Sequence, residues 1–280
     1  MIYISMNRDD FISIDAIRFG WNGLKNNLRF FSIIAIIVAV LYSFPSLIAT
    51  YLFGFQIPEE IHSTEELQMF LPLIFISMIL YLTVELGLVK IALNFRDNEI
   101  VEYEDLFRCY QLMIKYALAT MIFYFMIILP FLPTVAASTL VNQETTNTIV
   151  FFIAYIISLL AAICLYLKFQ FYDYSIVDRG LGPIEALKQS GRLTKGVLKN
   201  LLIFRVELAL AIGVAVAIAS IFVEIPFVLI FGLLSKDFAA FNDIENLVNL
   251  ATKLLITVPI SKLATADVYR RLEMRSTANS

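Results

Sequence analysis

Two charged side chains interrupt long apolar stretches of the sequence, and they are the first candidates for chemistry. Glu85 precedes Arg96 by about eleven residues, and Arg205 follows Lys199 by about six, which on a helix is a rise of roughly 16 and 9 Å from those bases. Charges at membrane depth are costly, so they mark ion, proton or substrate pathways or hold helices together. We expect Glu85 and Arg205 to form an intramembrane polar pair, with Glu207 as a competing partner for Arg205.

Other reactive residue types are scarce and do not form a recognisable site. His62 is the sole histidine, and Cys109 and Cys164 are too far apart for a C-x-x-C motif. Ser190 and Thr194 have no histidine base near them in the sequence. We therefore expect no catalytic residue, no metal site and no cofactor. The net charge of −3 also argues against a nucleic-acid partner.

The composition indicates which kind of secondary structure positions Glu85 and Arg205. Of the 280 residues, 60% are hydrophobic and 16% are charged, and the mean hydropathy is +0.80. Soluble domains carry about 45–50% apolar and about 25% charged residues. The sequence therefore predicts an all-α, polytopic membrane protein, because long apolar runs cross a bilayer as helices.

Six apolar runs are long enough to span a bilayer core, which takes about 20 residues. A break at Glu224 and Pro226 separates the fifth run from Phe227–Leu234, which we expect to be re-entrant or to lie on the outer surface. The alternative is that this segment forms a seventh span. Lys262 in the last run lies close enough to the interface for its ammonium group to reach the headgroups. The six runs are Phe30–Phe55, Met69–Phe95, Leu112–Val141, Ile149–Phe171, Leu198–Val223 and Leu247–Ala266.

The distribution of basic residues predicts the orientation. Lysines and arginines gather in residues 1–29, in the second–third and fourth–fifth connections, and in the tail, whereas the opposite loops are acidic. Basic loops stay in the cytoplasm, so both termini are expected there, and an even number of spans is required. Six spans satisfy this requirement and seven do not.

One charge pattern occurs three times and suggests an internal repeat. It reads acid, two residues, base, six residues, Lys, two residues, Leu. Each copy precedes a pair of apolar runs, so we expect a single membrane domain, residues 1–280, built from parallel repeats. The predicted units are 9–95, 101–172 and 183–266, followed by a tail, 267–280. The copies are Asp15, Arg18, Lys25, Leu28; Asp105, Arg108, Lys115, Leu118; and Glu185, Lys188, Lys195, Leu198.

The repeated pattern predicts three amphipathic helices on the cytoplasmic surface of the membrane. At about 100° per residue, Arg18 and Lys25 lie on one side of a helix, beside an apolar arc that includes Trp21 and Leu24. Such a helix lies at an interface with its bases directed toward headgroups. The alternative is a purely structural role, in which these helices only orient the transmembrane hairpins that follow them. The residues expected to face headgroups or a partner are Lys25, Lys115, Lys195, Arg18, Arg108 and Lys188.

A motif in the second half of the chain resembles a known family. The stretches 171–178, 182–190 and 193–196, together with the Tyr269–Leu272 ending, resemble the YciC-like group of bacterial membrane proteins. The same phrase is similar to one in the membrane domain of some glycerophosphodiester phosphodiesterases. The resemblance implies a six-helix protein of the bacterial inner membrane. It does not carry over the phosphodiesterase activity, because no soluble stretch here could form that catalytic barrel.

Three functional hypotheses follow from the sequence. The first is a non-catalytic membrane module whose surface helices bind anionic membrane lipids or another membrane protein. The alternative is a small permease-like carrier with a polar site around Glu85 and Arg205. A membrane-embedded lipid enzyme is a third possibility, because carboxylates near headgroups can perform acid–base work.

Overall fold

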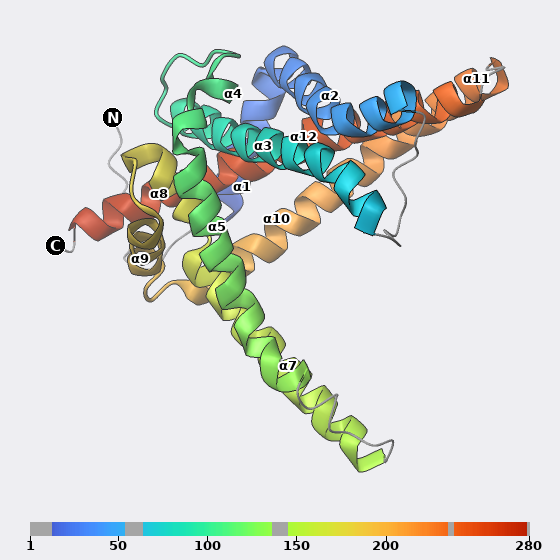
Figure 1. The fold of residues 1–280 in the computed structure, drawn as a ribbon. Coiled ribbons are helices and arrows are strands. Elements are labelled where there is room, and N and C mark those ends of the chain that lie inside the picture. Colours follow the sequence, from blue (N-terminus) through green and yellow to red (C-terminus); the bar gives the residue numbers. More distant parts are fainter. Residues whose placement is uncertain (1–12, 54–63, 136–144, 235–237, 279–280) are drawn as a thin grey trace. The chain divides into compact units, whose positions relative to one another are not determined.

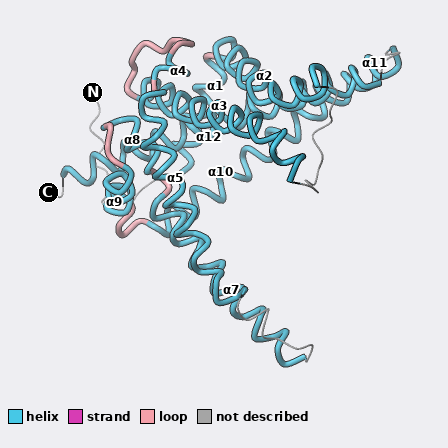
Figure 2. Tube along the Cα trace, in the orientation of Figure 1, coloured by secondary structure: helices cyan, strands magenta, loops and turns pink. Residues whose placement is uncertain are grey.

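The computed structural model describes residues 13–53, 64–135, 145–234 and 238–278, and within these ranges the chain forms helices and turns without a strand (Figures 1 and 2). Six helical stretches are long and apolar enough to cross a membrane. They follow the order of the predicted runs, so the all-α, six-span expectation is confirmed. The stretches are Leu28–Pro45, Leu71–Arg96, Asp105–Val135, Phe151–Arg179, Leu198–Leu229 and Ile244–Ala278.

The chain forms two compact units. The first comprises Met1–Tyr110 and Val206–Val268, and the second comprises Gln111–Arg205 and Tyr269–Ser280. The boundaries of these two compact units do not coincide with the boundaries of the three predicted repeats. The threefold repeat therefore stays a prediction, which a superposition of 14–95 on 104–172 would test.

The first unit is organised around the last helix, α12 (Phe238–Ala278), up to Val268. The hairpin helices α2 (Leu28–Phe53) and α3 (Thr64–Arg96) pack against each other, and α1 (Ser13–Asn26) lies against α12. Small residues allow this approach, because a Cβ at Gly20 would lie 2.7 Å from the carbonyl oxygen of Ile260. One face of α1 is therefore committed to packing within the protein.

A second close approach fixes α3 against the short helix α4 (Asp105–Arg108). A Cβ at Gly87 would lie 2.0 Å from the carbonyl oxygen of Leu106. Because Leu106 is fully buried, the α4 backbone has little room to move away. Gly87 is thus required by the packing of two backbones.

Replacing Gly87 by alanine is expected to lower the free energy of unfolding by about 1–3 kcal/mol, because overpacking forces the backbone to shift. Thermal unfolding in detergent measures this effect. Gly213→Ala is the matched control, since a Cβ at Gly213 meets nothing within 4 Å. Alanine should stabilise that helix by about 1 kcal/mol. Equal stability of the two variants would contradict the close contact at Gly87.

The second unit pairs α5 (Met113–Ile128) with α7 (Thr145–Phe169), which run side by side (Figure 1). Two short helices follow, α8 (Tyr172–Arg179) and α9 (Pro183–Leu193). Gly180 ends α8 with a φ of 63°, the left-handed conformation that favours glycine. The Glu185 carboxylate accepts a hydrogen bond from the Gly182 amide, which helps to fix the start of α9.

The predicted break after the fifth run is wrong. Helix α10 (Leu198–Ala219) continues through a π-helical turn, η3 (Ser220–Glu224), into α11 (Ile225–Leu234). Pro226 lacks an amide hydrogen, and a local π turn can accommodate that loss without ending the helix. Part of Phe227–Leu234 therefore extends the fifth candidate span, and the segment is not a separate seventh span in the described chain.

The three copies of the charge pattern adopt two different structures. In the first and third copies, a surface helix is followed directly by a span that begins at Leu28 or Leu198, as predicted. In the second copy, α4 has only four residues, and α5 has already begun at Met113, before Leu118. The reason is the packing of Leu106 against Gly87, which ties this segment to α3.

Candidate functional site

A charged pair lies within two candidate membrane-spanning helices of the first unit. The Glu85 carboxylate of α3 pairs with the Lys262 ammonium group of α12, and each side chain is 18% exposed. The ring of Tyr42 on α2 lies 5.9 Å from the ring of Tyr81, and Tyr42 interacts electrostatically with both charges. Lys262, which the sequence places near the interface, thus has the Glu85 carboxylate as a partner, and its closeness to the headgroups stays a prediction.

Arg205 finds its partners in the second unit. Its guanidinium donates a hydrogen bond to the Gln170 side chain and lies 5.8 Å from the centre of the Tyr166 ring. Glu207, the competing partner considered from the sequence, accepts a hydrogen bond from Ser13 in the first unit. Glu85 and Arg205 belong to different units, so their pairing is not tested and stays a prediction.

A second ion pair in the first unit lies outside the sequence-based prediction. Arg96 at the end of α3 meets Asp267 of α12, with 2.6 Å between Nε and Oδ1, and the Asp267 side chain is only 3% exposed. The guanidinium also lies 5.6 Å from the centre of the Phe19 ring on α1. Asp267 lies in the predicted tail, 267–280, although an acid within a run as apolar as 263–268 is a signal that the sequence already contains.

The six bases expected to face headgroups divide into two groups. Lys25, Lys188, Lys195 and Arg18 are exposed, and within the described residues Arg18 makes a 3.8 Å contact with Asp15. The other two bases, Lys115 and Arg108, are exposed but bind other parts of the protein. Lys115 donates to the Gly180 carbonyl at 2.8 Å, and Arg108 contacts Glu102, Glu104 and Asp105 at 2.7–3.6 Å. The first group retains the freedom that headgroup binding requires.

Helix α1 presents a second face away from α12. Leu24 packs inward with the small residues, whereas the apolar side chains of Ile14 and Trp21 on α1, and of Leu28 at the start of α2, are 55%, 48% and 52% exposed. These three positions repeat every seven residues, and Arg18 and Lys25 stand between them. The result is an exposed apolar stripe flanked by bases, which we call the α1 outer face.

Ser190 and Thr194 serve the local backbone. The Ser190 hydroxyl accepts a hydrogen bond from the Phe171 amide and donates one to the Lys168 carbonyl, both at 3.1 Å. The Thr194 hydroxyl donates to the same carbonyl at 2.9 Å. These bonds satisfy the end of α7, where carbonyls lack helical partners. Across the described ranges, no group of three His, Cys, Asp or Glu side chains could hold a metal ion.

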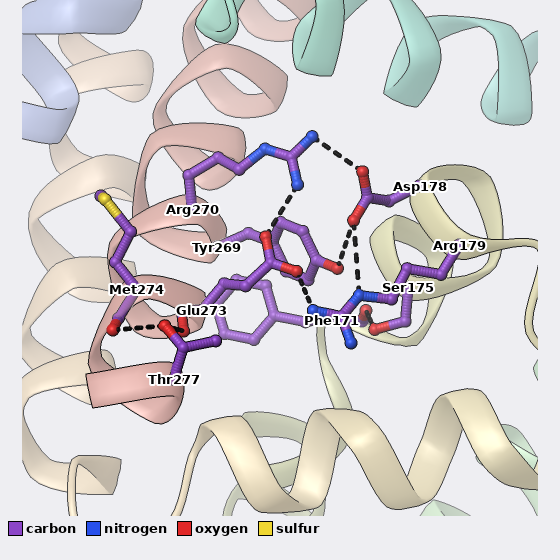
Figure 3. A network of polar contacts seen from close by, with 9 residues as sticks. All are labelled: Phe171, Ser175, Asp178, Arg179, Tyr269, Arg270, Glu273, Met274 and Thr277. Atoms are coloured by element: carbon purple, nitrogen blue, oxygen red, sulfur yellow. Dashed lines mark hydrogen bonds and ion pairs between the residues drawn. The ribbon is translucent and has the colours of Figure 1, made fainter. Parts of the chain in front are cut away.

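A polar network joins the end of α12 to α8 within the second unit (Figure 3). Asp178 accepts hydrogen bonds from the Tyr269 hydroxyl at 3.1 Å and from Arg270 at 2.7 Å. Glu273 pairs with Arg270 at 2.7 Å and also with Arg179. Thus the two separate stretches of the resemblance motif, around 171–178 and 269–272, meet in space.

Residues 107–272 match a family described as a domain of unknown function (DUF7847). The match covers more than half of the chain. The chain belongs to this family. A search of curated proteins and a search of solved structures each found no match.

The part of the chain that matches DUF7847 contains some of the candidate residues and omits others. It includes Lys262, Asp267 and the α9 bases, together with the capping residues of α7. It begins after α1 and after Glu85, so the α1 outer face lies in the remaining sequence. The match therefore includes Lys262 and Asp267 but not their α3 partners Glu85 and Arg96, and the family description itself names no activity.

Proposed function

We propose that this chain is a non-catalytic module of the bacterial inner membrane that binds anionic lipids through its basic surface helices. The observation that carries the proposal is the α1 outer face, where exposed apolar side chains alternate with exposed bases. An interfacial helix has this arrangement, because its apolar residues enter the acyl boundary while its bases contact headgroups. The resemblance to YciC-like proteins supports the same cellular location.

Helix α9, in the second unit, also combines a buried face with an exposed face that carries an apolar side chain and a base. Its inner face buries Ala186, Leu187 and Leu193. Ile184 is 58% exposed, and Lys188 is exposed one turn further along the helix. Bases near an anionic membrane surface contribute about 1 kcal/mol each. Each of these helices would therefore favour anionic over zwitterionic lipid.

Neutralising Lys25 of α1 and Lys195, in the turn directly after α9, to glutamine is expected to weaken the binding of anionic lipid about tenfold or more, because each lysine contributes about 1 kcal/mol. The measurement is the rise in Tm of detergent-solubilised protein during titration with phosphatidylglycerol, compared with phosphatidylcholine. Adding Lys115→Gln should weaken binding further, and the lost bond to Gly180 should lower the starting Tm.

Lys253→Gln provides the matched control for this titration, since Lys253 is exposed but belongs to the last candidate span and to neither surface helix. It should leave the phosphatidylglycerol response unchanged. An equal loss in the control and in the double variant would show that net charge alone sets the response. No loss in the double variant would contradict lipid binding by these helices and leave a protein partner as the alternative occupant.

The topology that this proposal requires places both termini in the cytoplasm. Reporter fusions after Glu60 and Thr145 should be periplasmic, and fusions after Ile100, Ser190 and Ser280 should be cytoplasmic. Alkaline phosphatase fusions are active when the fusion point is periplasmic, whereas green fluorescent protein fusions fluoresce when it is cytoplasmic. A periplasmic C-terminus would overturn the orientation, and with it the cytoplasmic position of the basic helices.

A second candidate function is the permease-like carrier. The observation that favours it is the convergence of Glu85, Lys262 and Tyr42 at membrane depth, from three different helices. Ionisable groups at this depth are typical of proton and ion pathways. The relevant centre would be Glu85 with Lys262, and the test that separates it from a structural pair is given in the Discussion.

A further inference from the structure

A groove on the first unit has a lining that neither candidate function uses. It has a volume of about 480 Å³ and lies between the C-terminal half of α1 and the segment that follows α3. Ligand pockets in proteins span about 300–1,000 Å³, so the groove can hold a small molecule or a headgroup. Its lining consists of Phe19, Asn22, Gly23, Asn26, Asn27, Phe95, Asn98, Glu99 and Val101.

The polar part of this lining consists of acceptors and neutral amides. Glu99 is the sole ionisable residue in the lining of the groove, and its side chain is exposed. Four asparagines supply amide groups, of which Asn27 already donates to the Gly23 carbonyl. A site without lysine or arginine and with one carboxylate disfavours anions, because an anion would meet like charge without a compensating base.

The end of α3 adds to this electrostatic preference. The helix ends at Arg96, and the chain turns at Asn98, which has a φ of 58°. The C-terminal carbonyls of a long helix carry partial negative charge. Arg96, the nearest base on α3, is paired with Asp267, so its charge is balanced within the protein.

The apolar walls are held by packing. Phe95 lies 5.5 Å from Phe31 and 6.5 Å from Phe30, measured between ring centres. Phe19 is fixed beneath the Arg96 guanidinium. These contacts hold the aromatic part of the lining in place, while the side chains of Asn22, Asn26 and Glu99 are exposed.

We propose that this groove binds a primary ammonium group, carried either by a soluble amine or by the headgroup of an amine lipid. An ammonium group has three N–H donors and no acceptor, which matches the Glu99 carboxylate and the amide oxygens of Asn22 and Asn26. Its attached carbon chain would lie against Phe19 and Phe95. This site is distinct from the basic outer faces of α1 and α9, and it selects the opposite charge.

The experiment uses the full chain purified in a neutral detergent, with ethanolamine as the soluble probe and ethylene glycol as its uncharged counterpart. Calorimetric titration should detect ethanolamine and not ethylene glycol. Glu99→Gln should weaken ethanolamine binding about tenfold, since a charged hydrogen bond is lost. Glu104→Gln removes the same charge from an exposed residue outside the groove and should change nothing.

A second experiment distinguishes a lipid headgroup from a soluble amine as the source of the ammonium group. Protein is extracted from nanodiscs of phosphatidylethanolamine and phosphatidylcholine, and retained lipid is measured by native mass spectrometry. Retention of phosphatidylethanolamine that depends on Glu99 supports a headgroup ligand, whereas ethanolamine binding without such retention supports a soluble amine. Equal binding of ethylene glycol, an unchanged affinity in Glu99→Gln, or failure of both arms would overturn the proposal.

Discussion

Asp267→Ala should lower the free energy of unfolding by about 3–5 kcal/mol, because it leaves the Arg96 guanidinium without its buried partner. Asp267 is 3% exposed, and 2.6 Å separates the paired atoms, so water does not replace the lost carboxylate. The same change also releases the guanidinium from its position over Phe19 on α1. Thermal unfolding in detergent measures the loss.

The double variant Arg96→Leu with Asp267→Leu distinguishes a lost pair from general disruption. Replacing both charges by apolar groups is often close to neutral, so the double variant should recover most of the stability. Asp15→Ala is the matched control, since its pair with Arg18 is exposed at 3.8 Å and such pairs contribute about 0–1 kcal/mol. A single variant as stable as wild type would show that Arg96 does not depend on Asp267.

Glu85→Ala and Lys262→Ala should each be destabilising by about 3 kcal/mol, because either change leaves one charge unpaired at membrane depth. The double variant Glu85→Gln with Lys262→Met should regain part of this loss. A double-mutant cycle of Glu85 with Arg205 is the control for the sequence-based pairing. We expect strong coupling with Lys262, and coupling of similar size with Arg205 would instead place Arg205 at the same centre.

The same variants decide whether the pair has a transport role. If the single variants unfold like wild type, the pair does not hold α3 to α12, and Glu85 becomes a titrating group of a carrier. Proteoliposomes containing a pH-sensitive dye should then show proton uptake in wild type and none in Glu85→Gln. A destabilised single variant without proton movement in wild type would support the structural role.

The resemblance motif shows how much of the site could be predicted from local sequence. Gly182 and Pro183 predict a helix start, and α9 begins there. The same stretch contains Ser190 and Thr194, whose type and spacing left their role open. Only the position of the α7 end, at Lys168, reveals that both hydroxyls satisfy a helix carbonyl. That partner lies more than twenty residues earlier, beyond the range of any helical periodicity.

The sequence alone determined the features that depend on runs of neighbouring residues. Apolar length specifies a span, because every backbone group in a bilayer must be paired within its own helix, and the charge pattern correctly predicts a surface helix before the first and fifth spans but not at its second copy. The tertiary structure decided which helices meet, and with them the partners of Glu85 and Asp267, which lie far away in the chain. It also decided that Leu24 packs inward while Trp21 stays exposed. A charge can pair with any opposite charge that packing brings near, so its partner follows from the contact of helices and not from its own sequence neighbours.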